Sequence, residues 1–303
     1  MKLPFKIKPS TQAFRASFFI NIIALIFYFF LIGGFSINDL GYFILTFFTA
    51  SIVLENFLTS YKTRLEEINI LKDQENYRRE FLGNVSHELK TPLFTIQGYI
   101  LTLIEGALKD KKVRGKYLRR SAKGVDRLIS IVKDLDLITQ FESGIKTVDK
   151  TDFNIYELIE NVYELMEFES EKNNTKLLVN NENNTPVIVN ADKERILQVL
   201  INLVVNSIKY GKEGGYTEVK VEEYDRDRII IRVKDNGEGI EDEHLPRLFE
   251  RFYRIDKNRS RKKGGSGLGL SIVKHIIEAH QEQIFVDSKI GQGTEFSFTL
   301  QKP

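Results

Sequence analysis

Residues 81–93 read Phe-Leu-Gly-Asn-Val-Ser-His-Glu-Leu-Lys-Thr-Pro-Leu and place a histidine, a carboxylate and a hydroxyl within five positions, directly before a proline. On a helix, His87 and Thr91 lie four residues apart and share a face. Glu88 follows the histidine immediately, where its carboxylate can accept the imidazole proton. Pro92 cannot donate to the carbonyl of Glu88, so the helix should bend or loosen there. The cluster favours chemistry on the histidine itself.

This cluster lies inside a long helical pattern. Apolar residues recur at three- and four-residue steps over residues 59–80, which predicts a helical linker resembling a short coiled coil. The same periodicity continues until Gly106 ends it. A second amphipathic stretch, over residues 117–138, closes at Ser143-Gly144. Two helices cannot bury both apolar stripes, so we expect residues 81–145 to dimerise into a four-helix bundle.

The first sixty residues are far more apolar than the rest of the chain. No charge occurs over residues 16–38, and Glu55 is the only charge over residues 40–58. Each of these two apolar runs is long enough to cross a bilayer as a helix, and Gly33-Gly34 between them is typical of a turn. We therefore expect a two-helix transmembrane hairpin over residues 16–58.

Basic residues flank this hairpin on both sides. They are Lys2, Lys6, Lys8, Arg15, Lys62, Arg64, Lys72, Arg78 and Arg79. Because basic residues favour the cytoplasmic side, we expect a multi-pass protein with both termini in the cytoplasm and residues 1–15 as a cytoplasmic N-terminus. A secretory signal peptide is the alternative, but a second apolar run follows closely and no clear small-x-small cleavage site is present.

The composition excludes some classes of protein. The 303 residues are 42% hydrophobic and 28% charged, and the net charge of +2 is too small to indicate direct nucleic-acid binding. The chain contains no cysteine, which excludes disulfides and thiolate metal sites.

From about Thr151 onward, strands alternate with helices. The predicted strands cover residues 176–179, 187–189, 218–222, 229–234, 284–287 and 295–300. Two of the last strands are sequential, so we expect an α+β sandwich with a mixed sheet over residues 151–303.

A polar stripe marks the helix predicted over residues 192–210. Asn202 and Asn206 are spaced by four, and Lys209 and Tyr210 extend the stripe. One interpretation is a solvated helix face. The other is a metal-phosphate site, because amide oxygens bind Mg²⁺, a lysine can approach a phosphate and a tyrosine can stack on a base.

Asp235 ends an apolar strand and is followed by Gly237 and Gly239. A carboxylate at this position can accept a hydrogen bond from the amino group of a base, while bare backbone lets the ring approach. Asp-Asn-Gly is also common in ordinary tight turns, so both interpretations stay open.

A glycine-rich segment over residues 264–274 follows a basic loop over residues 251–263. Glycines that open a helix present backbone N–H groups to an anion, so this segment is a candidate phosphate cradle. It is neither a Walker A loop nor a dinucleotide fingerprint.

These motifs occur in an order that resembles the membrane sensor histidine kinases of bacterial two-component systems, over about residues 78–300. The motifs are Ser86-His-Glu-Leu-Lys-Thr-Pro-Leu93, Asn202-Leu-Val-Val-Asn-Ser-Ile-Lys-Tyr210, Asp235-Asn-Gly-Glu-Gly239, Leu248-Phe-Glu-Arg-Phe-Tyr-Arg254 and Gly265-Ser-Gly-Leu-Gly-Leu270. The resemblance implies that residues 81–145 form the dimerisation and histidine phosphotransfer domain, and residues 151–303 the catalytic ATP-binding domain.

The resemblance also implies a role for each residue. His87 would be the phosphoacceptor that attacks the γ-phosphate of ATP, with Glu88 as general base. Asn206, assisted by Asn202, would bind Mg²⁺, and Asp235 would read adenine. The other implied nucleotide-binding residues are Lys209, Tyr210, Gly237, Gly239, Phe252, Arg254, Gly265, Gly267, Leu268, Gly269, Leu270 and Thr294.

Partners follow from the same resemblance. The phosphoryl group would pass from His87 to an aspartate of a cognate response regulator, and the kinase would act as a homodimer embedded in the bacterial cytoplasmic membrane. Glu88 and Thr91 match a Glu-x-x-Thr phosphatase pattern, so Thr91 would orient water when the partner is dephosphorylated. The short turn between the two spans leaves no room for an extracellular sensor domain, which favours intramembrane sensing or a membrane sensory partner.

Two other functions stay open. An ATPase of the gyrase, chaperone and mismatch-repair type would explain the C-terminal motifs but not the cluster around His87. A membrane-tethered dimeric scaffold could bind ATP without transferring phosphate, although the presence of Asn206, Asp235 and both glycine segments argues against it.

Overall fold

The computed structural model describes residues 37–142, 148–180, 185–255 and 265–303, together with Arg15 and residues 18–20, 22–24 and 26–29. The chain divides into two units, Met1–Glu80 and Phe81–Pro303.

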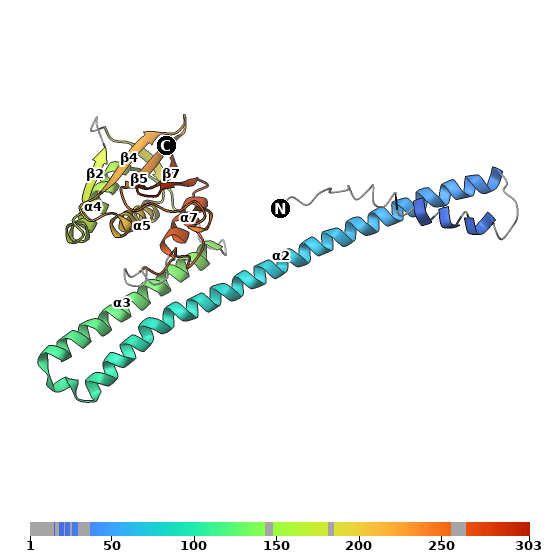
Figure 1. Ribbon diagram of the computed structural model, residues 1–303. Coiled ribbons are helices and arrows are strands. Elements are labelled where there is room, and N and C mark those ends of the chain that lie inside the picture. The colour runs from blue at the N-terminus through green and yellow to red at the C-terminus, as the bar shows by residue number, and fades with distance from the viewer. Residues whose placement is uncertain are drawn as a thin grey trace. The chain divides into compact units, whose positions relative to one another are not determined.

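In the first unit, the described residues between Phe18 and Phe29 are helical, and helix α2 (Ile37–Ile104) begins shortly after them (Figure 1). By length and composition, α2 holds one stretch that is long and apolar enough to cross a membrane. The ring of Phe18 meets the ring of Phe47 edge-on, with 6.4 Å between their centroids. The predicted turn at Gly33-Gly34 lies outside the described residues.

Helix α2 is one continuous helix that contains the second apolar run, the predicted linker and the residues around His87. Its backbone stays helical through Pro92, whose ring is buried. The hydroxyls of Thr91 and Thr95 donate to the carbonyls of His87 and Thr91, at 3.2 and 2.9 Å. A proline removes a single backbone N–H donor from the helix. The backbone hydrogen bonds of the neighbouring residues are sufficient to keep α2 helical on both sides of Pro92.

A short turn reverses the chain after α2. Gly106 takes a φ of 134°, which a residue with a side chain rarely adopts, and the 3-10 helix η1 (Ala107–Lys109) follows. The carboxylate of Asp110 then accepts from the backbone N–H groups of Lys112 and Val113, at 2.8 and 3.3 Å, and so caps helix α3 (Lys111–Glu142). The predicted end at Gly106 is confirmed, whereas the predicted close at Ser143-Gly144 lies outside the described residues.

Helices α2 and α3 form an antiparallel hairpin, and they approach each other closely at Gly124. A Cβ at this position would stand 2.7 Å from Cγ1 of Ile96, so only glycine lets the two helices come this near. Farther toward the turn, the rings of Tyr99 and Tyr117 stack with centroids 5.2 Å apart.

Part of the apolar surface of this hairpin is exposed in the single chain. The exposed apolar side chains in this hairpin include Leu82, Leu93, Phe94, Ile100, Leu101, Ile104, Leu118, Val125, Ile129 and Val132. The end of α3 packs against a different part of the protein, because Leu137 and Ile138 are buried in the core of the C-terminal part. The prediction that Ile138 belongs to the bundle stripe is therefore wrong.

The C-terminal part is built on a five-stranded sheet with strand order β2-β4-β5-β7-β6 (Figure 1). The strands are β2 (Lys176–Asn180), β4 (Tyr216–Glu223), β5 (Arg228–Asp235), β6 (Ile284–Lys289) and β7 (Gly293–Gln301). Strands β2 and β4 are parallel and the other pairs antiparallel, so the predicted mixed sheet is confirmed.

A second, two-stranded sheet pairs β1 (Thr151–Asn154) with β3 (Ile188–Ala191) antiparallel. The predicted strand at residues 187–189 thus belongs to this small sheet and not to the main one. Strand β1 was not predicted, because four residues with two exposed side chains carry almost no alternation of their own.

Three helices, α4 (Ile155–Lys172), α5 (Lys193–Tyr210) and α7 (Gly269–Ala279), lie over one face of the main sheet (Figure 1). The short 3-10 helix η2 (Leu245–Arg247) precedes the described part of the basic loop. Asp192 caps α5 by accepting from the backbone N–H of Arg195 at 3.1 Å. The apolar face of α5 is buried in the core, which leaves its polar stripe for the opposite side.

We predict opposite effects for two glycine-to-alanine changes in the hairpin. Gly98 lies on an exposed part of α2 with open space around a Cβ, so Gly98→Ala should stabilise the hairpin by about 0.5–1 kcal/mol. Gly124→Ala should destabilise it by about 1–3 kcal/mol, because the added methyl overlaps Ile96. Amide hydrogen exchange across residues 111–142 measures both changes. Equal exchange in the two variants would contradict the close approach.

Candidate functional site

The polar stripe of α5 faces the glycine segment that begins α7. A Cβ at Gly269 would stand 3.3 Å from the side-chain oxygen of Asn202, so the two segments are in contact there. Asn206 lies one turn farther along α5, and both asparagines are half-buried. Two amide oxygens on one helix face, opposite the N-terminus of another helix, suit a hard cation and the anion it accompanies.

The end of α5 meets the first described residues of the same glycine segment. A Cβ at Gly265 would stand 2.6 Å from Nζ of Lys209 and 3.8 Å from the hydroxyl of Tyr210. The ammonium of Lys209 lies 5.1 Å from the centroid of the Tyr210 ring. A cation and an aromatic ring therefore lie beside backbone that carries no side chain. The cation suits a nucleotide phosphate, and the ring suits a base.

Asp235 ends β5 and its side chain is only 6% exposed. Its Oδ1 accepts from the backbone N–H groups of Gly237 and Thr294, at 2.7 and 3.2 Å. Burial raises the pKa of Asp235, and these two N–H donors offset part of that increase. The hydroxyl of Thr294 also bonds the Ser288 hydroxyl at 2.8 Å, so the carboxylate is held in one orientation.

The glycines around Asp235 are required by the protein's own packing. A Cβ at Gly237 would stand 2.6 Å from the carbonyl oxygen of Tyr210. At Gly239 and Gly293, which have φ of 76° and 107°, a Cβ would overlap the carbonyls of Lys289 and Asp235. Bare backbone at these positions is thus needed to assemble the site even before a ligand enters it.

Phe252 takes a positive φ of 61° and lies at the junction with α2. Its backbone N–H donates to the carbonyl of Gly267 at 2.8 Å, and a Cβ at Gly267 would come within 2.8 Å of the Phe252 Cα. The ring of Phe252 lies against the ring of Phe81, with 5.9 Å between centroids. This residue therefore connects the glycine segment to the helix that carries His87.

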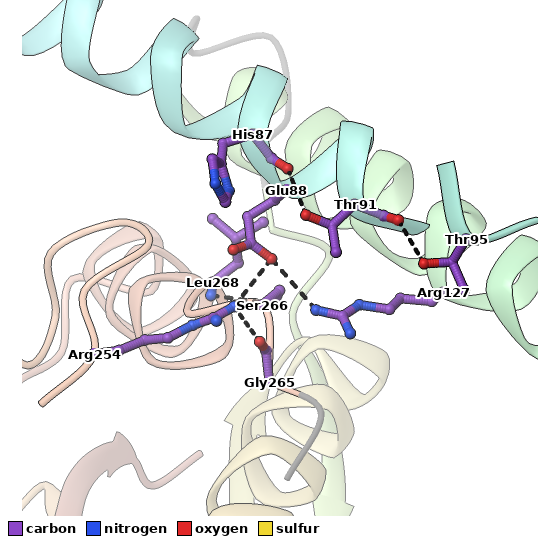
Figure 2. A network of polar contacts seen from close by, with 9 residues as sticks. All are labelled: His87, Glu88, Thr91, Thr95, Arg127, Arg254, Gly265, Ser266 and Leu268. Carbon is purple, nitrogen blue, oxygen red and sulfur yellow. Dashed lines mark hydrogen bonds and ion pairs between the residues drawn. The ribbon is translucent and has the colours of Figure 1, made fainter. Parts of the chain in front are cut away.

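Glu88 is the centre of a network that joins both parts of the second unit (Figure 2). Its Oε2 accepts from Nη2 of Arg254 at 3.1 Å and from Nη2 of Arg127 at 3.4 Å. Arg254 also donates to the carbonyl of Gly265. The side chains of Glu88 and Arg254 are 12% and 7% exposed, so this ion pair is largely removed from water.

His87 and Thr91 lie beside this network on α2 (Figure 2), and both residues are exposed. The hydroxyl of Thr91 donates to the carbonyl of His87 and remains close to the surface. A histidine at the surface, next to an acid largely removed from water, can meet a reactant that a second domain delivers.

Arg127 was not among the residues predicted from the sequence. A signal for it exists in the register of the hairpin, because Glu88 stands sixteen residues before the end of α2 and Arg127 sixteen residues after the start of α3. Residues equally distant from a tight turn face each other in an antiparallel pair. The pairing also depends on the turn at Gly106 and η1, whose geometry only the structure defines.

The remaining predicted residues fall into two groups. Leu268 is buried and Leu270 half-buried at the start of α7. The basic side chains Lys257, Arg259, Arg261, Lys262 and Lys263 lie outside the described residues. The donor set that is described, two amide oxygens, a lysine, a buried carboxylate and glycines at a helix start, fits ATP with Mg²⁺.

Two protein families match this chain. Residues 191–303 match the family described as "Histidine kinase-, DNA gyrase B-, and HSP90-like ATPase". Residues 77–144 match the "His Kinase A (phospho-acceptor) domain".

Curated relatives match over most of the chain. The sensor histidine kinase WalK of Bacillus subtilis is 37% identical over 229 residues, which is 75% of this chain and 37% of that protein. The sensor protein kinase WalK of Staphylococcus aureus is 36% identical over 248 residues, which is 80% of this chain and 58% of that protein. The chain therefore spans less than two thirds of the length of these relatives.

Solved structures of histidine kinases are also similar. One is histidine kinase AdeS of Acinetobacter baumannii, at 26% identity and a TM-score of 0.57, covering 71% of this chain and 98% of that one. Another is histidine kinase ThkA in complex with the response regulator protein TrrA, at 27% identity and a TM-score of 0.59, covering 79% of this chain and 66% of that one.

We predict that Asp235→Asn stabilises the fold at neutral pH. Asparagine keeps an oxygen for the Gly237 and Thr294 N–H groups and removes the buried charge. Because the folded-state pKa of Asp235 is raised, its contribution to stability is present below the ordinary aspartate pKa of about 4 and is lost as the pH rises through the folded value. The advantage of the variant should therefore shrink on acidification.

Thermal unfolding between about pH 4 and pH 8 measures this difference. The exposed Asp242→Asn, which removes a surface carboxylate, serves as the matched control. A lower unfolding temperature for Asp235→Asn at neutral pH would show that the charge is compensated in the fold.

Proposed function

The chain belongs to the sensor histidine kinases of bacterial two-component systems, and on that premise we propose that it phosphorylates His87 from ATP and passes the phosphoryl group to an aspartate of a response regulator. The observation that carries the proposal is the ion pair between Glu88 and Arg254. Through Arg254, this ion pair links the acid next to His87 to the glycine segment of the ATP-binding domain. An ATPase without a phosphoacceptor would not need such a link.

The nucleotide would be bound by the residues that surround the start of α7. Asp235 accepts from the amino group of adenine, and Tyr210 stacks beside the ring. Asn206, with Asn202 one turn away, would hold Mg²⁺, which would neutralise charge on the phosphates. Lys209 adds a positive charge next to the bare backbone of Gly265.

The transfer itself uses few protein groups. The unprotonated ring nitrogen of His87 attacks the γ-phosphorus in line, the bond between that phosphorus and the bridging oxygen breaks, and ADP leaves with the electron pair. The proton on the other ring nitrogen passes to Glu88, which acts as general base. Positioning of the two reactants contributes most of the rate acceleration.

A homodimer is supported by the apolar side chains that the single hairpin leaves exposed on α2 and α3. Exposed apolar residues at helical spacing are typical of a bundle interface. Pairing of two hairpins would bury these side chains between four helices.

The membrane arrangement is the finer part of the proposal. We propose that residues 16–58 form a transmembrane hairpin with both chain ends in the cytoplasm, and that the stimulus reaches it within the membrane or through a membrane partner. The contact between Phe18 and Phe47 supports the pairing of the two apolar runs. Replacing the hairpin with an unrelated two-span anchor should abolish the response to the stimulus, and unchanged signalling would contradict this.

The kinase reaction predicts a labelled histidine. Incubation of the chain with γ-labelled ATP should give a protein label that is stable in base and labile in acid, and His87→Gln should lose it completely because no nucleophile remains. Nucleotide binding by this variant should be unchanged. Hydrolysis without label would favour the ATPase, and binding without either would favour the scaffold.

The reverse reaction predicts a role for Thr91. Thr91→Ala should slow dephosphorylation of the phosphorylated response regulator by about tenfold or more, because the hydroxyl that orients water is removed. Autophosphorylation should change little, and Thr95→Ala, one turn farther along α2, is the matched control. Unchanged dephosphorylation in Thr91→Ala would refute the phosphatase role.

A further inference from the structure

We propose that Arg127 is a positioning residue that keeps the Glu88 carboxylate beside His87 when Arg254 turns to the nucleotide. The inference rests on the proposed function, in which Glu88 is the general base, and on the resemblance, which assigns Arg254 to the bound nucleotide. It adds to that function a residue on α3 and an exchange of ion-pair partners.

The two arginines share one oxygen of Glu88 (Figure 2). Oε2 accepts from Arg254 at 3.1 Å and from Arg127 at 3.4 Å, while the carboxylate side chain is 12% exposed. A carboxylate so far from water is stable only while a cation compensates it. Because two guanidinium groups bind this carboxylate, one of them can move away while the other still compensates its negative charge.

The two arginines differ in what they are attached to. Arg254 belongs to the ATP-binding domain and also donates to the carbonyl of Gly265, beside Lys209. A bound triphosphate carries more negative charge than one carboxylate, so it competes with Glu88 for Arg254. Arg127 belongs to α3, in the same hairpin as Glu88, and no movement of the ATP-binding domain is needed to keep that contact.

The hairpin packing explains why Arg127 reaches Glu88. Gly124 lies one turn before Arg127 and approaches Ile96 and the carbonyl of Pro92, at 2.7 and 3.9 Å from an added Cβ. Pro92 lies one turn after Glu88. Because the helices are antiparallel, the close approach at Gly124 brings the next turn of α3 opposite the preceding turn of α2.

The exchange of partners has a consequence for the reaction. Without Arg127, departure of Arg254 would leave the buried carboxylate uncompensated, and the side chain would turn toward water and away from the imidazole. With Arg127, Glu88 stays paired and oriented while Arg254 stabilises the phosphate. The rate at saturating ATP would therefore depend on Arg127, whereas the affinity for ATP would not.

Autophosphorylation of the full chain in membrane vesicles tests this assignment. Arg127→Gln should lower the rate at saturating γ-labelled ATP by about tenfold, with the KM for ATP changed less than about twofold. Arg127→Lys should recover most of the rate, because it restores a cation. Lys123→Gln removes an exposed charge from the preceding turn of α3 and should match the unmodified chain.

A double-mutant cycle separates positioning from a general effect on the fold. If Arg127 acts through Glu88, adding Arg127→Gln to Glu88→Gln should cause no further loss of rate. Additive losses, a raised KM for ATP, or an unchanged rate in Arg127→Gln would each overturn the inference. Absence of label in the unmodified chain would instead refute the proposed function, and with it the role of Arg127.

Discussion

The carboxylate of Glu88 accepts hydrogen bonds from two guanidinium groups that belong to different parts of the fold. Arg127 ties it to α3, and Arg254 ties it to the glycine segment at the start of α7. Because the carboxylate is largely removed from water, its stability depends on these cations. The helical hairpin and the α+β part are therefore joined by an ion pair. The rings of Phe81 and Phe252 add an apolar contact between the same two parts.

The α+β part depends on a second constraint, the close approach of backbone segments around Asp235. Gly237, Gly239 and Gly293 each face a carbonyl that a side chain would overlap. The same approach directs the Gly237 and Thr294 N–H groups onto Asp235. Packing thus requires the same glycines that are proposed to border the nucleotide.

Patterns in the sequence were sufficient where the signal is local. The periodicity over residues 59–103 predicts the helix found as part of α2, and the order of the strands predicts the mixed sheet. Local signals failed where contacts between distant residues decide. Strand β1 is recognisable only beside β3, and Ile138 follows the bundle periodicity yet is buried in the core of the α+β part. The contact between the rings of Phe252 and Phe81 also joins segments that no local pattern pairs.

The sequence by itself determined the family, the order of the motifs and the residue types available for phosphoryl transfer, because each motif is a short run with its own chemistry. Only the tertiary structure decided which of these residues are partners. Glu88 and Arg254 are 166 residues apart and Glu88 and Arg127 are 39 apart, so both pairs depend on how distant segments pack. The pairs form because Gly124 lets two helices approach closely and because the glycine segment folds back onto α2 through Phe252, and both are properties of packing.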